Sequence, residues 1–321
     1  MNTPQVSICI PAYRQTDYLR ETLRSVKEQE FEDYELIVSD DTPDDTVQQL
    51  VESFGFDSRL RYFRNSASLG SPENWNAAVR LAKGKYIKLL HHDDRFINSG
   101  ALGVFVRMLD ENPDADFAFS ASSAENVIHG HKHDHSPSKE QVEQLVATPE
   151  KLFLGNFVGA PSATIYRNGL GIEYDRALKW LVDVDFYIRV LQKNSRFVYT
   201  PEVLIATPTS AGHQVTELCK NDANIDMFEH LYVYGKIVTK ISNDPGVRNV
   251  WFRLFERYRI YSREDLANLE IKLPEQESLL APFFRAYEKN RLRRAPYRVY
   301  ARLPDSLKRI IRKVYRKFYP S

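Results

Sequence analysis

Alternation of apolar runs with helix-like runs is the feature of this sequence that most constrains its fold. In the first 120 residues, runs of strand length alternate with segments whose apolar residues recur every three or four positions. The expected strands are Val6–Tyr13, Tyr34–Asp41, Leu60–Arg64, Tyr86–Leu90 and Phe117–Ser120. The expected helices are Tyr18–Glu28, Thr46–Phe54, Asn74–Lys83 and Leu102–Leu109. Strands joined by such helices form right-handed crossovers, so the sequence predicts an α/β fold with a Rossmann-like, mainly parallel sheet and flanking helices.

The pattern changes in the second half of the chain. It is lost between residues 129 and 149, where we expect a loop. Two further strand-like stretches, Ala163–Tyr166 and Arg196–Thr200, flank a helix expected at about 181–192. Beyond residue 213 the chain becomes helical and rich in aromatic residues. We therefore expect a sheet domain over residues 1–215 and a helical C-terminal region over residues 216–321.

Composition places the chain among ordinary globular proteins, with 43% apolar and 27% charged residues. Cys9 and Cys219 are the two cysteines, too few for a disulfide framework, which favours a reducing cytosol. No run of about 18 apolar residues occurs that would span a bilayer. The polar start, Met1–Gln5, leads directly into the first strand and does not resemble a signal peptide. We expect a cytoplasmic protein.

The net charge of +1 conceals a basic C-terminus. Residues 289–321 hold twelve Lys and Arg residues against one acid, Asp305, which leaves the preceding residues at about −10. Residues 305–319 combine apolar positions at helical spacing with a basic opposite face. Such an amphipathic helix favours the surface of an anionic membrane, here the inner face of the cytoplasmic membrane. The alternatives are packing against the acidic body and, less favoured, contact with nucleic acid.

Polar side chains follow the first four expected strands. In an open parallel sheet, ligands bind outside the carboxyl ends of the strands, so these residues are expected to share one site. They are Pro11, Ala12 and Tyr13 after the first strand, Asp40 and Asp41 after the second, Asn65 and then Gly70 after the third, and His91, His92, Asp93 and Asp94 after the fourth.

Two pairs of adjacent Asp residues stand at these strand ends. Neighbouring carboxylates repel each other unless a cation or a donor compensates, and Mg²⁺ or Mn²⁺ with a bound diphosphate is a common compensator. Asp40 and Asp41 have an equally good alternative as cap or turn residues, whereas Asp93 and Asp94 favour a site. The turn after the first strand has no Gly-rich phosphate loop, which argues against dinucleotide dehydrogenases and P-loop NTPases. Tyr13 could supply an aromatic face to a nucleotide base.

The order of these motifs resembles the family 2 glycosyltransferases, which are inverting enzymes of the GT-A fold and serve bacterial surface-polysaccharide synthesis among other pathways. The resemblance covers about residues 5–215. It is carried by VSICIPAY (Val6–Tyr13), LIVSDD (Leu36–Asp41), Asn65 to Gly70 with Asn74 and Asn76, LHHDD (Leu90–Asp94) and WLVDVDFYIR (Trp180–Arg189).

The resemblance implies a role for each matching position. Pro11, Ala12 and Tyr13 would line the nucleotide pocket. Asp41, with Asp40 as a second candidate, would bind the nucleobase, most often uracil, and Asn65, Gly70 and Asn74 would complete the donor site. Asp93 would contact the ribose or donor sugar, Asp94 would hold Mn²⁺ or Mg²⁺, and His213 is a further metal or diphosphate candidate. Asp183 would be the catalytic base. His91 departs from the family, which often has Asp at that position.

The implied activity is transfer of a sugar from a nucleotide donor, UDP-sugar favoured, to a glycan or lipid-linked acceptor. Asp185 is expected to pair with Arg189 rather than to act as the base. Gly159–Ser162 is either a simple turn or part of the acceptor site. The alternating histidines from His129 to His135 favour a solvated loop near the cleft over a transition-metal site. The rival functions are a sugar-phosphate nucleotidyltransferase and a non-catalytic, membrane-associated nucleotide-sugar-binding protein.

Overall fold

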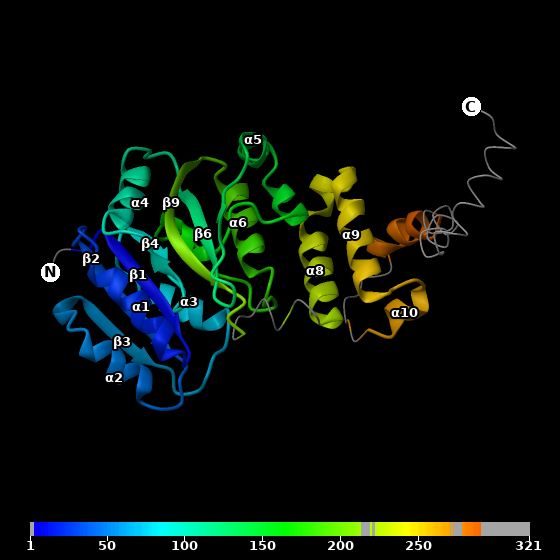
Figure 1. Ribbon diagram of the computed structural model, residues 1–321. Coiled ribbons are helices and arrows are strands. Elements are labelled where there is room, and N and C mark those ends of the chain that lie inside the picture. The colour runs from blue at the N-terminus through cyan, green and yellow to red at the C-terminus, as the bar shows by residue number, and fades with distance from the viewer. Residues whose placement is uncertain (1–2, 213–218, 220–221, 270, 272–277, 290–321) are drawn as a thin grey trace, which may run out of the picture. The chain divides into compact units, whose positions relative to one another are not determined.

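The computed structural model describes residues 3–212, 219, 222–269, 271 and 278–289 (Figure 1). The chain divides into two compact units, residues 1–242 and 243–321. The domain boundary expected near residue 215 falls among residues outside the described part. Helix α8 (Ala223–Ile241) is counted with the first unit, which also contains the whole sheet.

The first unit is built on a nine-stranded sheet in the described part of the chain. Its order is β3-β2-β1-β4-β8-β6-β9-β5, and β7 pairs with β6. Strands β3, β2, β1 and β4 run parallel, as the sequence predicts, while β8 pairs antiparallel with both β4 and β6. The strands are β1 (Val6–Ala12), β2 (Tyr34–Asp40), β3 (Leu60–Arg64), β4 (Tyr86–Leu89), β5 (Arg95–Phe96), β6 (Phe117–Asn126), β7 (Lys132–His135), β8 (Thr164–Arg167) and β9 (Phe197–Thr209).

Helices flank this sheet (Figure 1). Alternation along β1 sends Val6, Ile8 and Ile10 to one face, where they share a buried core with residues of α1, α2 and α4. Cys9 points to the other face, and its thiol contacts the Ala78 carbonyl of α3. The helices of this unit are α1 (Thr16–Lys27), α2 (Thr46–Ser53), α3 (Glu73–Arg80), α4 (Ala101–Asp110), α5 (Lys139–Ala147), α6 (Val182–Lys193) and α8, with short 3-10 turns η1 (Asp57–Arg59), η2 (Pro149–Leu154) and η3 (Pro161–Ala163).

The loop expected over residues 129–149 is wrong, because this segment holds a strand and a helix. Strand β7 pairs antiparallel with the end of β6, where His135 lies opposite Ser122. Helix α5 begins at a capping box in which Ser138 and Gln141 bond each other's backbone N–H groups. The backbone pairing of β7 leaves no apolar signature, since its Lys132 and His133 are exposed. In the described residues, the tract does not gather three metal-ligating side chains.

The second unit is helical where it is described. It contains α9 (Pro245–Tyr258), α10 (Arg263–Ala267) and helical residues 278–289. Trp251 and Phe255 are buried, and the ring of Phe255 stacks on that of Phe284 with centroids 4.4 Å apart. These contacts form the unit's own apolar core. The basic segment 305–319 lies outside the described residues.

Among the described residues, every helix is either too short or too polar to span a membrane.

Candidate functional site

A cavity of about 870 Å³ opens at the carboxyl ends of β1, β2 and β4. The strand-end rule places it there, because parallel strands deliver their following residues to one edge of the sheet. Eleven of the residues expected at the site line it. They come from the four motifs before residue 100 and from the motif at residue 183: Pro11, Ala12, Tyr13, Asp41, Gly70, Asn74, His91, His92, Asp93, Asp94 and Asp183.

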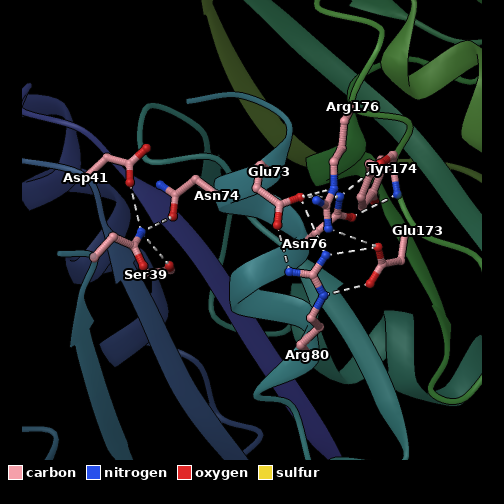
Figure 2. A network of polar contacts seen from close by, with 10 residues as sticks. Ser39, Asp41, Glu73, Asn74, Asn76, Arg80, Glu173, Tyr174 and Arg176 are labelled. Atoms are coloured by element: carbon pink, nitrogen blue, oxygen red, sulfur yellow. Dashed lines mark hydrogen bonds and ion pairs between the residues drawn. The ribbon is translucent and has the colours of Figure 1, made fainter. Parts of the chain in front are cut away.

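Asp41 anchors one wall of this cavity through three donors. Its Oδ1 accepts hydrogen bonds from Asn65 Nδ2 at 2.8 Å and from the Leu69 N–H at 3.0 Å, and its Oδ2 accepts one from the Gly70 N–H at 2.8 Å. The Asn65 amide also donates to Asn74 Oδ1 at 3.0 Å, so Asp41 and Asn74 face the same amide (Figure 2). Gly70 adopts a φ of 71°, which favours glycine. The loop after β3 is therefore fixed against β2.

Asp40 and Asn65 do not line the cavity. Asp40 is fully buried, and its two oxygens accept hydrogen bonds from the Thr42 N–H at 2.8 Å and from the Tyr62 hydroxyl at 2.6 Å. This is the turn role that the sequence left open for it. Asn65 lies behind Asp41 and orients it. Both residues support the wall of the cavity from within the protein.

His91, Asp93 and Asp94 offer one ligand atom each within 4.8 Å of one another. Burial, and next the Asp93 carboxylate, raise the pKa of Asp94 well above its ordinary value. Shielding from water lowers the pKa of His91 to about 4, so its imidazole is neutral near pH 7 and can act as a ligand. A neutral imidazole and two carboxylates that repel each other fit a divalent cation. His213, the further candidate, lies outside the described residues.

Ser162 contacts this cluster directly, and the buried Lys88 supports Ser162. The Ser162 hydroxyl accepts a hydrogen bond from the His91 N–H at 2.9 Å and also bonds the Asp94 side chain. The buried Lys88 ammonium donates to the carbonyls of Ser162 and Thr164 and lies 4.1 Å from the ring centroid of Phe105. Within segment 159–162, Ser162 therefore supports the metal-ligating cluster, while Ala160 and Pro161 line the cavity.

Asp183 lies in the first turn of α6, on the cavity wall. Its Oδ2 accepts a hydrogen bond from Asn156 Nδ2 at 2.7 Å, and its Oδ1 accepts one from the Val184 N–H at 2.8 Å. Burial raises the pKa of Asp183 to about 7, and the hydrogen bonds to its ionised form oppose that rise. A carboxyl with this pKa is suited to accept a proton near neutral pH.

Asp185 points to a different environment from Asp183. Its Oδ2 pairs with Arg189 at 2.7 Å, as the i, i+4 spacing predicts, and its Oδ1 pairs with Lys236 of α8 at 2.7 Å. Its side chain is 2% exposed. With both oxygens held by cations, Asp185 fastens α6 to α8 and is not free to serve a substrate.

A second polar network joins α3 to the segment before α6. Arg80 bonds Glu73 and Glu173, and Arg176 bonds Glu73 at 2.7 Å (Figure 2). Beneath these exposed pairs, the Asn76 side chain accepts from the Tyr174 N–H at 2.8 Å and donates to its carbonyl at 2.9 Å. The network fixes the half of the cavity that carries Asn74 relative to the half that carries Asp183.

Several lining residues were not expected from the sequence. Trp75 packs its ring 4.5 Å from that of His91, and Lys179 and Trp180 lie just before α6. The others are Ser68, Ser71 and the end of β9, namely Thr207, Pro208, Thr209 and Ser210. Strand β9 extends beyond the predicted Thr200 because it pairs with β6 as far as Thr209. Trp75 lies between the motif residues Asn74 and Asn76, and Trp180 and Ser68 lie within quoted motifs, which is the signal that could have identified them.

Comparison with known proteins agrees with this geometry. A curated relative is a β-1,3-glucosyltransferase of Campylobacter jejuni that acts on GalNAc(5)-diNAcBac-PP-undecaprenol, with 31% identity over 34% of this chain and 35% of its own. The Staphylococcus aureus protein TarS, solved with UDP-GlcNAc, aligns with a TM-score of 0.60 and 20% identity over 88% of this chain and 81% of its own. A Pyrobaculum calidifontis mannosyltransferase, solved with GDP-Man and Mn²⁺, aligns with a TM-score of 0.57 and 14% identity over 92% and 87%.

These solved structures share the GT-A-like arrangement of the present sheet. Residues 7–172, just over half of the chain, match the sequence model of the family described as Glycosyl transferase family 2. That match includes the segments after β1, β2, β3 and β4 that line the cavity. The chain belongs to glycosyltransferase family 2.

Proposed function

We propose that this glycosyltransferase inverts the anomeric centre as it moves a sugar from a nucleoside-diphosphate donor to a hydroxyl of its acceptor. The observation that carries the proposal is the sharing of one cavity by two unlike groups. One is the His91, Asp93 and Asp94 cluster, which suits a cation, and the other is Asp183, a carboxyl with a pKa of about 7. An inverting transfer needs charge stabilisation for the leaving group and a base for the nucleophile.

Asp183 is the base in this mechanism. Its ionised carboxylate accepts the proton of the acceptor hydroxyl as that oxygen bonds to the anomeric carbon. The bond from the anomeric carbon to the diphosphate oxygen breaks on the opposite face, and the electron pair leaves with the diphosphate. Asn156 and the Val184 N–H keep the carboxylate oriented through their hydrogen bonds.

Asp93 and Asp94, with His91 beside them, would hold Mn²⁺ or Mg²⁺. The cation, when bound, supplies positive charge that neutralises the departing diphosphate. Ser162 keeps Asp94 and the His91 backbone in place. The Mn²⁺ in the mannosyltransferase complex supports a divalent ion of this type for the family's fold.

The donor lies against the first two strands in this proposal. Tyr13 is 45% exposed at the cavity and offers its ring face to the nucleobase. Asp41 contacts the nucleotide from the wall that it shares with Asn74. Pro11, Ala12, Gly70 and Asn74 complete the pocket. We favour a UDP-sugar, which TarS binds, although the mannosyltransferase was solved with GDP-Man.

The acceptor is a glycan or a lipid-linked oligosaccharide in this proposal, and the product is part of a bacterial surface polysaccharide. The Campylobacter jejuni relative, whose name specifies an undecaprenol-linked acceptor, supports this choice. An enzyme that uses such an acceptor gains from attachment to the inner face of the cytoplasmic membrane. The basic segment 305–319 would provide that peripheral attachment.

Incubation of the full chain with a panel of nucleotide sugars, Mn²⁺ and mixed glycan or lipid-linked acceptors tests the function. We expect release of a nucleoside diphosphate and a product with inverted anomeric configuration by NMR. Release of pyrophosphate from a nucleoside triphosphate and a sugar phosphate would instead establish the nucleotidyltransferase. Donor binding without turnover across the panel would favour the non-catalytic alternative.

A further inference from the structure

The buried side chain of Glu229, on helix α8, binds the backbone of the cavity wall. Its carboxylate accepts three hydrogen bonds from three successive backbone N–H groups that precede α6. Oε1 accepts from Lys179 at 2.7 Å, and Oε2 accepts from Trp180 at 2.9 Å and from Leu181 at 2.7 Å. Glu229 is 1% exposed. A carboxylate in this position fixes the backbone that leads into the first turn of α6.

The backbone that Glu229 binds is part of the proposed site. Lys179 and Trp180 line the cavity, and Asp183 follows two residues after Leu181. Two helical turns later on α8, Lys236 bonds Asp185 at 2.7 Å and Asp175 at 2.6 Å. Helix α8 therefore fastens the α6 start at two points, one on each side of Asp183.

We propose that Glu229 is a positioning residue of the transferase, which holds the backbone before α6 and so sets the location of Asp183. This inference rests on the proposed function, in which Asp183 is the base. Sequence motifs do not identify Glu229, because it lies 50 residues from Lys179 and belongs to none of the family motifs.

The charge of Glu229 also acts on Asp183, and the direction of its effect on the pKa of Asp183 is definite. Burial is the main cause of the raised pKa of Asp183, and the negative charge of Glu229 raises it further. Neutralising Glu229 should therefore lower the pKa of Asp183 and move the acidic limb of the rate profile to lower pH. Tyr174 and Tyr187 are the titratable groups beside Asp183, and Cys219 and His230 are those beside Glu229. Lys179, Asp222 and Asp226 act on Cys219, and Arg189 and Lys236 pair with Asp185.

The test compares Glu229→Gln with Asp222→Asn in the full chain. Asp222 is a matched control, because it caps the start of α8 through the N–H groups of Asn224 and Ile225. For Glu229→Gln we expect faster hydrogen–deuterium exchange in residues 179–181, a kcat at least roughly tenfold lower with little change in donor KM, and an acidic limb at lower pH. Asp222→Asn should leave the limb where it is in the wild type.

A second variant keeps the test decisive if Glu229→Gln folds poorly. Glu229→Asp retains the charge on a shorter side chain, so it should quicken exchange in residues 179–181 while the acidic limb stays in place. Unchanged exchange in both variants, or a fall in kcat matched by Asp222→Asn with no movement of the limb, would overturn the inference. A wild type that never transfers sugar would overturn the proposed function instead, while the exchange result would still decide whether Glu229 holds this backbone.

Discussion

Replacement of Asp183 by Asn removes the proposed base while it preserves the shape of the side chain. The structure limits the structural cost of this change. Two donors, Asn156 Nδ2 and the Val184 N–H, point at the two carboxylate oxygens, so an Asn at this position can satisfy one of them and faces the other with its own NH₂. Loss of one such hydrogen bond costs about 1 kcal/mol of stability.

The catalytic cost should be larger. General-base catalysis contributes roughly 10²- to 10⁴-fold to a rate, which corresponds to about 3–5 kcal/mol of transition-state stabilisation. We therefore expect Asp183→Asn to lower kcat by at least roughly 10²-fold, with a nearly unchanged dissociation constant for the donor. Single-turnover transfer and calorimetric titration with the donor measure the two quantities separately.

Asp185→Asn is the control with the same chemical change on the same helix. It breaks the pairs with Arg189 and Lys236, so it should lower thermal stability more than Asp183→Asn does. The acidic limb of the pH–rate profile of Asp185→Asn should remain where it is in the wild type. Wild-type turnover in Asp183→Asn, or equal losses of kcat in both variants, would refute the role given to Asp183.

Three further predictions concern the same cavity. Asn156→Ala removes a hydrogen bond that favours the ionised form of Asp183, so the pKa of that carboxyl should rise above about 7. The acidic limb of the pH profile of kcat should then move to higher pH. An acidic limb that keeps its position or moves to lower pH contradicts this. Asp94→Asn should lower transfer by roughly 10²-fold or more and weaken activation by Mn²⁺, since a bound cation supplies several kcal/mol of charge stabilisation; full activity at the wild-type Mn²⁺ concentration would exclude Asp94 as a ligand. Tyr13→Ala should weaken binding of the nucleotide sugar by about 1–3 kcal/mol, measured by calorimetry, with little effect on Asp183. An unchanged affinity would show that the nucleobase does not stack on Tyr13.

The strand ends were predictable from sequence because topology alone brings them together. Buried strands such as β1 and β2 give clear apolar runs, and parallel pairing then places Tyr13, Asp41 and Asp94 at one edge. Sequence did not separate Asp40 from Asp41, since the two are adjacent. What separates them is the Tyr62 hydroxyl of β3, which binds Asp40 and can be assigned only once strand register is known.

Contacts made across long stretches of sequence were not predictable. Strand β7 is held by backbone pairing with β6, which its polar side chains do not reveal. Glu229 acts through backbone N–H groups, and these place no demand on the identity of the residues that carry them. Asn156 likewise reaches Asp183 from 27 positions earlier, with no motif around it.

A crystal structure with Mn²⁺ and the nucleoside diphosphate that the enzyme releases would test the central claim most directly. We predict an anomalous peak for Mn²⁺ beside the carboxylates of Asp93 and Asp94. The diphosphate should lie next to the Mn²⁺, and the nucleobase should stack on the ring of Tyr13. Asp183 should face the diphosphate from across the same cavity. A nucleotide bound elsewhere, or a cation that avoids both carboxylates, would contradict the account.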